Sequence, residues 1–320
     1  MTIDLPPLQT PETLHEVATK AEPGSPEWSR MVTASKVAGM LGESAYSTPY
    51  STHCLMNGHK EDISDMTDRF NAGHAFEGVM ADWLLLNHPE WRLSRGEVQV
   101  TNPHLPFPNA ATPDRIATIK NARRSPKNSR TVQFKTVQDW EEWSNLTEET
   151  IPTDWLIQVT WEMLVSGLIE NPAVLFVLGP YYSHQEFHIE YDADFARVLA
   201  EQVAKFLLTL DGPPPAPTSP RDYKIAKLRH PDIDDDADPV TLDDKLAADW
   251  VRVKTAQKEA DAAARRAKAD SETIGARVLE AMERGAEATD PKGVVIATRS
   301  ATKRGVQLRF KVPKAAKATA

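Results

Sequence analysis

Hydrophobic residues recur at three- and four-residue steps in several parts of the chain, and this period predicts amphipathic helices. Within the first 210 residues, the expected helices cover residues 33–42, 68–88, about 154–167, and 194 to about 210. The first is expected to be capped by Thr33 or Ser35 and to end at Gly42. One face of the second collects Phe70, His74, Glu77, Met80, Ala81 and Leu84. Glu77 is therefore expected on or beside the buried face.

Short hydrophobic or alternating runs between these helices are typical of β-strands. The expected strands cover residues 97–101, roughly 110–119, 130–136, 173–179 and 185–191. The first three are expected to form an antiparallel meander whose last connection is rich in lysine and arginine. Helices before, between and after these strands predict an α/β (α+β) fold, in which a mixed central sheet is flanked by helices.

A proline-rich stretch, DGPPPAPTSPRD at 211–222, is expected to act as a semi-rigid spacer after the core. The predicted organisation is an N-terminal extension at 1–28, a core domain at 29–211, a proline-rich and acidic linker at 212–240, and an appendage at 241–320. In the appendage, helical spacing from Leu242 to about Arg284 predicts one long helix or a helical hairpin broken near Gly275. A β-hairpin with a Lys-Arg-Gly turn is expected over 293–312.

The chain of 320 residues has a net charge of −9, which argues against a sequence-blind coat for nucleic acid. After Asp290, however, the sequence contains no acidic residue and eight basic ones: Lys292, Arg299, Lys303, Arg304, Arg309, Lys311, Lys314 and Lys317. The single cysteine, Cys54, excludes an intramolecular disulfide and a Cys-rich zinc site. Neither a signal peptide nor a hydrophobic run long enough to span a bilayer is recognised, so a cytoplasmic protein with no membrane partner is expected.

The stretch TPDRIATIKNARRSPKNSRTVQFKT, residues 112–136, places Asp114 on one expected strand, with Gln133 and Lys135 on the next. Because alternate residues of a strand share a face, Gln133 and Lys135 are expected side by side. Cleavage of a phosphodiester needs carboxylates that hold a divalent cation and a positive charge that stabilises the transition state. Mg²⁺ takes oxygen ligands, and Glu77 can supply a further carboxylate. The same residues also fit a turn begun by Asp114 and a solvated Lys135, so these positions alone leave both interpretations open.

Five short motifs occur in order between about residues 28 and 210: VTASKV, AGHAFEG, ATPDRI, VQFKT and IQVTWEM. Their order resembles that of the phage-type exonucleases related to lambda exonuclease, called YqaJ-like viral recombinases, within the restriction-endonuclease-like nuclease superfamily. The resemblance implies a restriction-endonuclease-like core. It implies catalytic roles for Asp114, Gln133, Lys135 and Glu77, metal ligation by Asp114, Gln133, Phe134 and Glu77, and substrate binding by Ser35, Thr112, Gln158 and Arg30.

The same resemblance implies a metal-dependent exonuclease that resects double-stranded DNA ends from 5′ to 3′ and exposes single strands for recombination. The implied cofactor is Mg²⁺, for which Mn²⁺ can substitute. The implied partners are duplex DNA ends, a single-strand annealing protein and further copies of the chain in a homo-oligomer. If the protein is encoded by a phage, it would act in the host cytoplasm.

Gln133 stands where the family generally has a metal-binding glutamate, and an amide oxygen can ligate a cation without bringing a charge. Glu77 could compensate for the lost charge, and so could Glu162 if its helix faces the site. Two other functions therefore stay open: a catalytically weakened DNA-end-binding or adaptor protein, and a structural protein whose long C-terminal helix pairs with itself or a partner.

Four tryptophans could stack on bases, although tryptophan in an amphipathic helix more often lies in the core. They are Trp140, Trp143, Trp155 and Trp161, and Trp161 stands where the family has a tyrosine.

Overall fold

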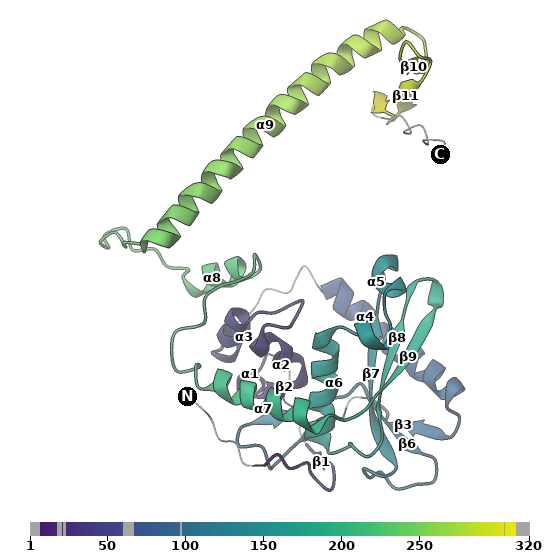
Figure 1. Cartoon of the computed structure of the whole chain (residues 1–320), viewed down its shortest axis with the longest axis vertical. Coiled ribbons are helices and arrows are strands. Elements are labelled where there is room, and N and C mark those ends of the chain that lie inside the picture. The colour runs from purple at the N-terminus through teal and green to yellow at the C-terminus, as the bar shows by residue number, and fades with distance from the viewer. Residues whose placement is uncertain are drawn as a thin grey trace, which may run out of the picture. The chain divides into compact units, whose positions relative to one another are not determined.

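The computed structural model describes residues 7–17, 21, 24–59, 67–96, 98–303 and 305–311, without the side chains of residues 67–70. The chain forms two compact units, Met1–Ile233 and Asp234–Ala320. Unit 1 contains a mixed sheet with helices, and unit 2 contains a long helix and a small antiparallel sheet (Figure 1). Among the described helices, none combines the length and the hydrophobicity that crossing a membrane requires.

A five-stranded sheet in the order β3-β6-β7-β8-β9 forms the centre of unit 1. Its strands are β3 (Trp91–Leu93), β6 (Arg115–Ile119), β7 (Ser129–Thr136), β8 (Ala173–Leu178) and β9 (His184–Ile189). β7 and β8 run parallel, whereas the other neighbouring strands are antiparallel. Parallel neighbours need a crossover connection, and α6 (Thr153–Ser166) lies in it. The fold is therefore the predicted α/β (α+β) arrangement of a mixed central sheet with flanking helices.

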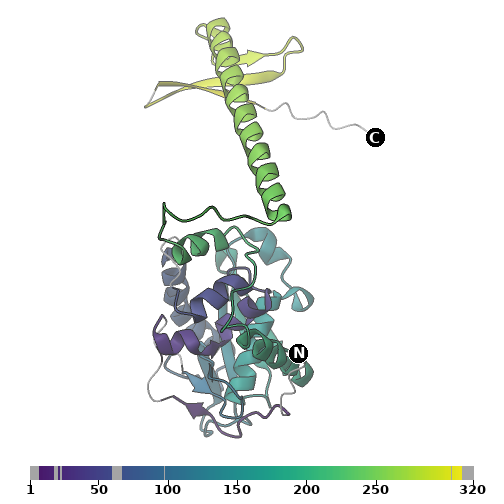
Figure 2. The ribbon, with the colours of Figure 1, turned by 90° about the vertical axis from the view of Figure 1, so that its left-hand side faces the viewer.

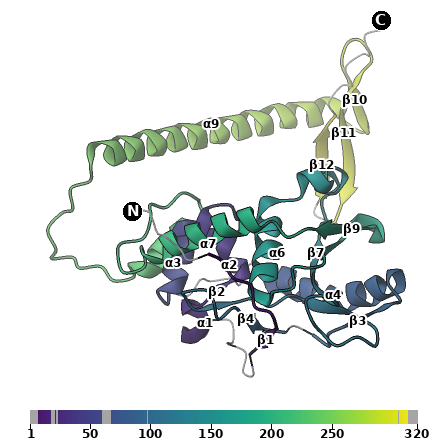
Figure 3. The same cartoon turned by 60° about the horizontal axis from the view of Figure 1, so that its bottom comes forward.

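Helices cover both faces of this sheet (Figure 3). They are α6 on one face and α4 (Thr67–Asn87) on the other, and α2 (Ala34–Leu41) and α7 (Ala193–Leu207) pack against α6. Met80 of α4 packs against Phe134 of β7 on one face. On the other face, Leu175 of β8 packs with the first turns of α6, and Leu175 is the register partner of Gln133. Since side chains alternate along a strand, Gln133 and Lys135 share the face that α6 covers.

Shorter elements complete the described part of unit 1. They are α1 (Pro26–Arg30), α3 (Pro49–Met56), α5 (Trp140–Ser144), α8 (Asp222–Arg229), the 3-10 turns η2 (Glu148–Thr150) and η3 (Pro180–Tyr182), and the strands β1 (His15–Glu16), β2 (Val32–Thr33), β4 (Val100–Thr101) and β5 (Asn109–Ala110). β1 pairs with β4, and β2 pairs with β5, which holds the start of α2 next to the segment that leads into β6.

The four helices predicted in unit 1 correspond to α2, α4, α6 and α7. Gly42 ends α2 as predicted, with a φ of 79° that glycine adopts without steric cost. Thr33 stands at the N-terminal cap position of α2, but its side chain makes no capping bond. On α4, Met80, Ala81 and Leu84 are buried as predicted, whereas His74 is exposed. The side chain of Phe70 lies outside the described residues.

The strand predictions need two corrections. The strand expected at 97–101 does not join the meander, because Val100 and Thr101 pair with β1, while β3 takes the place beside β6. Glu97 lies outside the described residues. The strand expected at 110–119 is divided into β5 and β6. Pro113 lies between them and has no N–H to give to a strand ladder, so Asp114 immediately precedes β6 rather than lying inside a strand.

The proline-rich stretch leads into α8, a helix inside the segment predicted as a linker. Ile225 of α8 packs against Tyr50 and Cys54 of α3. The chain before the prolines is also held by α3, since the His53 ring lies 3.0 Å from the Thr209 carbonyl oxygen. Unit 1 therefore continues past residue 211, through α8.

Asp222, at the start of α8, is fully buried. Its carboxylate accepts hydrogen bonds from the Thr48 hydroxyl (2.7 Å) and from the backbone amides of Thr218 (2.8 Å) and Ser219 (2.9 Å). A buried carboxylate needs such donors because water no longer solvates its charge. This residue therefore ties the end of the proline-rich stretch to the cap of α3.

In unit 2, α9 (Asp244–Met282) is one uninterrupted helix, so the alternative of a helical hairpin is wrong (Figure 2). The helix continues through Gly275, where an added Cβ would lie 3.6 Å from Leu308. The predicted hairpin is β11 (Val295–Thr302) with β12 (Gly305–Phe310), and β10 (Glu287–Thr289) adds a third antiparallel strand.

Candidate active site

A cavity of about 420 Å³ in unit 1 is lined by α2, α4, α6 and β7, together with the residue that precedes β6. The predicted site residues that line it are Ser35, Glu77, Asp114, Gln133, Phe134, Lys135 and Gln158. These residues come from segments that are far apart in the sequence, and the mixed sheet brings them together. A concave site with a few convergent polar groups is the usual form of a ligand or substrate site.

Asp114 is fixed against the neighbouring strand by a backbone hydrogen bond. The amide of Phe134 donates to Asp114 Oδ2 at 2.7 Å, and the Arg115 guanidinium donates to the Asp114 carbonyl oxygen at 2.5 Å. Because Phe134 lies between Gln133 and Lys135 on β7, this bond holds the carboxylate beside both of them. A hydrogen bond to an ionised carboxylate is stronger than one between neutral groups.

A chain of hydrogen bonds connects β7 with α6. Lys135 Nζ donates to Gln158 Oε1 at 2.7 Å, and Gln158 Nε2 donates to Glu162 Oε1 at 3.0 Å. Gln158 and Glu162 are four residues apart and therefore lie one above the other on the same side of α6. The side-chain amide of Gln158 thus orients the ammonium group of Lys135 and one oxygen of a carboxylate at the same time.

Glu162 is completely buried, and its Oε2 has no hydrogen-bond partner among the residues that the structure describes. The same is true of Gln133 Oε1. Burial, and to a lesser extent the Asp114 charge, raise the pKa of the Glu162 carboxyl to about 8, whereas Gln158 and Lys135 act in the opposite direction. Buried polar oxygens without partners are rare in folded proteins. This pair is therefore suited to accept a cation.

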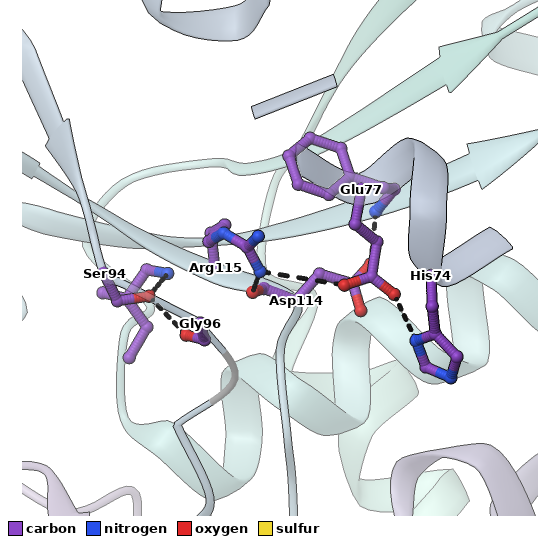
Figure 4. Close-up of polar contacts among 8 residues, drawn as sticks. His74, Glu77, Ser94, Gly96, Asp114 and Arg115 are labelled. Atoms are coloured by element: carbon purple, nitrogen blue, oxygen red, sulfur yellow. Dashed lines mark hydrogen bonds and ion pairs between the residues drawn. The ribbon is translucent and has the colours of Figure 1, made fainter. Parts of the chain in front are cut away.

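Glu77 lies at the same cavity but already has cationic or potentially cationic neighbours (Figure 4). His74 Nδ1 lies 2.9 Å from Glu77 Oε1, and Arg115 Nη1 lies 3.8 Å from Glu77 Oε2. Figure 4 shows the Arg115 guanidinium in contact with the Asp114 carbonyl oxygen and with the Glu77 carboxylate, and His74 on the other side of Glu77. The predicted metal-ligand role of Glu77 would require its carboxylate to leave or share these partners.

Two predicted substrate-binding residues lie away from the cavity lining. Thr112 is half-buried in the segment between β5 and β6, and Arg30 is exposed in the last turn of α1. Ser35 does line the cavity, and its hydroxyl lies 3.2 Å from that of Thr33. The basic loop at 120–128 joins the far ends of β6 and β7, which is about 20 Å from Lys135 at about 3.3 Å per strand residue.

The four tryptophans considered for base stacking separate into two groups. Trp143 and Trp161 are buried, as expected for core residues, whereas Trp140 is 59% exposed and Trp155 lines the cavity. Tyr46 and Asp154 also line it and were not singled out by the sequence. No sequence signal marked Tyr46, because it lies in a short loop without periodicity. Asp154 lies in the first turn of α6, where acidic residues are common because they stabilise the helix N-terminus, so its position does not by itself indicate a site.

A metal site made from three acidic, histidine or cysteine side chains is absent from the part of the chain that the structure describes. The candidate oxygen ligands come instead from Asp114 and the amide of Gln133, which line the cavity, and from the buried Glu162, which lies close enough to Asp114 for that charge to raise its pKa. All three are hard oxygen donors, the type that Mg²⁺ and Mn²⁺ take from proteins. The residues present therefore fit a divalent cation of this class.

Comparisons with known proteins return distant structural likenesses. No protein-family model matches the chain, and no curated protein matches it either. The crystal structure of an alkaline exonuclease, LHK-Exo, from Laribacter hongkongensis is 15% identical, covers 64% of this chain and 96% of its own, and has a TM-score of 0.44. The complex of LHK-Exo with dAMP gives the same identity and TM-score. The structure of SSO0001 is 12% identical, with a TM-score of 0.33, and covers 62% of this chain and 81% of its own.

Proposed function

We propose that this protein is a metal-dependent nuclease that hydrolyses phosphodiester bonds of DNA. The observation that carries the proposal is the pair of buried oxygens on Gln133 and Glu162 that have no partner among the described residues, together with Asp114 and Lys135, whose charges both act on Glu162. At such a site the oxygen atoms can bind a cation, and the lysine can bind an anionic substrate beside it. Phosphodiester hydrolysis needs this combination.

Asp114, Gln133 Oε1 and the Phe134 carbonyl would hold Mg²⁺, with Glu77 nearby, and Mn²⁺ would substitute for it. When bound, the cation would neutralise charge on the scissile phosphate and lower the pKa of a water molecule. The cavity of about 420 Å³ is large enough to admit a nucleotide phosphate with its sugar.

The chain's own side chains would position the substrate and its charge. Lys135, oriented by Gln158, would place its ammonium against the phosphate oxygen that gains negative charge, and it would also orient the attacking water. Ser35 would donate its hydroxyl to a neighbouring phosphate from the first turn of α2. Thr112 and Arg30 lie outside the cavity lining, so any contact of theirs would be with DNA beyond the cleaved nucleotide.

The finer assignment is an exonuclease that resects double-stranded ends from 5′ to 3′ and exposes single strands for recombination. It is supported by the order of the five motifs in the sequence, from VTASKV to IQVTWEM. The partners proposed with it are duplex DNA ends, a single-strand annealing protein and further copies of this chain.

A second candidate is a protein that retains DNA ends without cleaving them. The observation in its favour is Gln133, because an uncharged ligand on β7 weakens the attraction for a divalent cation. The two candidates differ in one measurable property. Both would bind DNA ends, but only the nuclease would shorten them in a metal-dependent manner.

An end-labelled duplex incubated with Mg²⁺ and the full-length protein tests the proposal. We expect degradation by the wild type and none by Asp114→Asn or Lys135→Ala, because these changes remove a cation ligand and a charge stabiliser without creating a cavity. Lys120→Ala is a matched control, since Lys120 is exposed at the far end of β6. Circular dichroism would verify that all three variants fold. Intact DNA with the wild type in both Mg²⁺ and Mn²⁺ would favour the end-binding candidate, and full activity of Lys135→Ala would refute the site.

A further inference from the structure

The β7 position beside Asp114 has the neutral residue Gln133, and α6, which covers it, has the acidic residue Glu162. Gln133 shares the α6 face of the sheet with Lys135 and is 5% exposed. Glu162 lies on α6, one turn after Gln158, and is 0% exposed. The charges of Asp114 and Lys135 both act on the pKa of Glu162, so Glu162 lies close to these two residues. Two acids therefore lie close together at this edge of the cavity: Asp114, which lines it from the segment before β6, and the buried Glu162 on α6.

A fully buried carboxylate is expensive unless it is protonated, paired or bound to a cation. Glu162 Oε1 accepts a hydrogen bond from Gln158, but Oε2 has no partner among the described residues. The neighbouring Gln133 Oε1 is also without one. One lysine, Lys135, lies nearby, and its ammonium donates to Gln158 rather than to Glu162. A divalent cation would satisfy both oxygens and balance the charges of the two acids.

We propose that Glu162 is a cation ligand, which supplies from α6 the negative charge that Gln133 does not supply from β7. The site then consists of Asp114, the Gln133 amide oxygen and Glu162, and it takes Mg²⁺ or Mn²⁺. The choice of cation rests on the proposed function, whereas the ligand set rests on the two unpartnered oxygens. Glu77 is a weaker source of the missing charge, because its carboxylate already contacts Arg115 and His74.

The rival role for Glu162 is that of a neutral acid that serves only as a hydrogen-bond partner for Gln158. The two roles respond differently to Glu162→Gln. Glutamine keeps the size of the side chain and an oxygen that accepts from Gln158, but it has no charge. A purely structural Glu162 would tolerate this change, and a cation ligand would not.

Binding of Mn²⁺ to the full-length protein, followed by the electron paramagnetic resonance signal of free Mn²⁺, tests the proposal without DNA. We expect Glu162→Gln to weaken Mn²⁺ binding by roughly tenfold or more, since affinity for a hard cation depends on the charge of its ligands. The exposed Glu170, just beyond α6, provides the matched control Glu170→Gln, which should bind Mn²⁺ like the wild type. The double variant Gln133→Glu/Glu162→Gln returns the charge to β7 and should regain most of the lost affinity.

Wild-type affinity in Glu162→Gln would overturn the proposal. A double variant that folds, by near-ultraviolet circular dichroism, yet fails to regain affinity would overturn the claim that Glu162 substitutes for a charge at position 133. The proposed function fails separately. If the wild type binds Mn²⁺ through Glu162 but degrades no DNA, the nuclease proposal falls and the cation site stands. If the wild type degrades DNA and Glu162→Gln retains both Mn²⁺ affinity and degradation, the proposed role of Glu162 as a cation ligand falls and the nuclease proposal stands.

Discussion

The buried Glu162 carboxyl should make the stability of the cation-free protein depend on pH in a way that Glu162→Gln removes. Burial, with a smaller contribution from Asp114, raises the pKa of Glu162 from 4.5 to about 8 in the folded state. Between these values the folded protein holds a proton that the unfolded chain has released. The free energy of unfolding therefore falls as the pH rises from about 4.5 to about 8, and the glutamine variant lacks this loss.

The size of the effect follows from proton linkage. One proton contributes about 1.4 kcal/mol per pH unit in the middle of the window. Between pH 5 and pH 7, Glu162→Gln should therefore gain about 2 to 3 kcal/mol in unfolding free energy relative to the wild type. At pH 4 the two proteins should differ little, because Glu162 is then protonated in both states of the chain.

Urea unfolding of the full-length proteins in EDTA, at pH 5, 6 and 7, measures this difference. Tryptophan fluorescence reports mainly on unit 1, because Trp250 is the one tryptophan of the eight in the sequence that lies beyond residue 233. Glu170→Gln should follow the wild-type curve at every pH. Parallel curves for Glu162→Gln and the wild type would refute the reasoning, since they would mean that Glu162 titrates alike in the folded and unfolded chains.

Three further predictions concern other parts of the molecule. Asp222→Ala should lower the unfolding free energy of unit 1 by about 2 to 3 kcal/mol in urea titrations, because the Thr48 hydroxyl and two backbone amides lose a buried charged acceptor; an unchanged midpoint would contradict this. Gly179→Ala should lower the melting temperature by several degrees, since an added Cβ would overlap the Trp143 indole, and a second change, Trp143→Leu, should relieve part of the loss. Deletion of residues 292–320 should weaken duplex binding and flatten its salt dependence, by about one unit of slope for each phosphate that the tail neutralises. Fluorescence anisotropy would measure duplex binding at several salt concentrations. If the full-length and truncated proteins show the same salt dependence, the tail charges face solvent and do not contact DNA.

The sequence was sufficient for the elements whose periodicity extends over many residues. α7 and α9 have hydrophobic residues on one side over several turns, and glycine follows α2 and α6 where their hydrophobic runs stop. The sequence was insufficient for strand partners, since β3 and β4 are two or three residues long and their pairing depends on tertiary contacts. Pro113 could have warned that the run at 110–119 is interrupted.

In the candidate site, too, the features that follow from a repeating pattern could be predicted, and those that depend on tertiary contacts could not. Alternation on β7 was enough to place Gln133 and Lys135 on one face, and this face is the one that α6 covers. The rotation of α6 about its own axis could not be obtained from periodicity, because Glu162 falls among hydrophobic residues that are all buried. A charged residue at such a position was therefore ambiguous until the hydrogen bond from Gln158 and the influence of Asp114 defined its surroundings.

The contact of α8 with α3 decides where proteases can divide the chain. The proline-rich stretch is held at both ends, by α3 near Thr209 and by the Asp222 carboxylate. Residues 231–243, in contrast, are exposed throughout and form neither helix nor strand. They include the run DIDDDAD, so a protease specific for aspartate meets several accessible peptide bonds there. Limited digestion should therefore yield a stable fragment that retains α8, and an expression fragment that stops at residue 211 would expose Tyr50 and Cys54 to solvent.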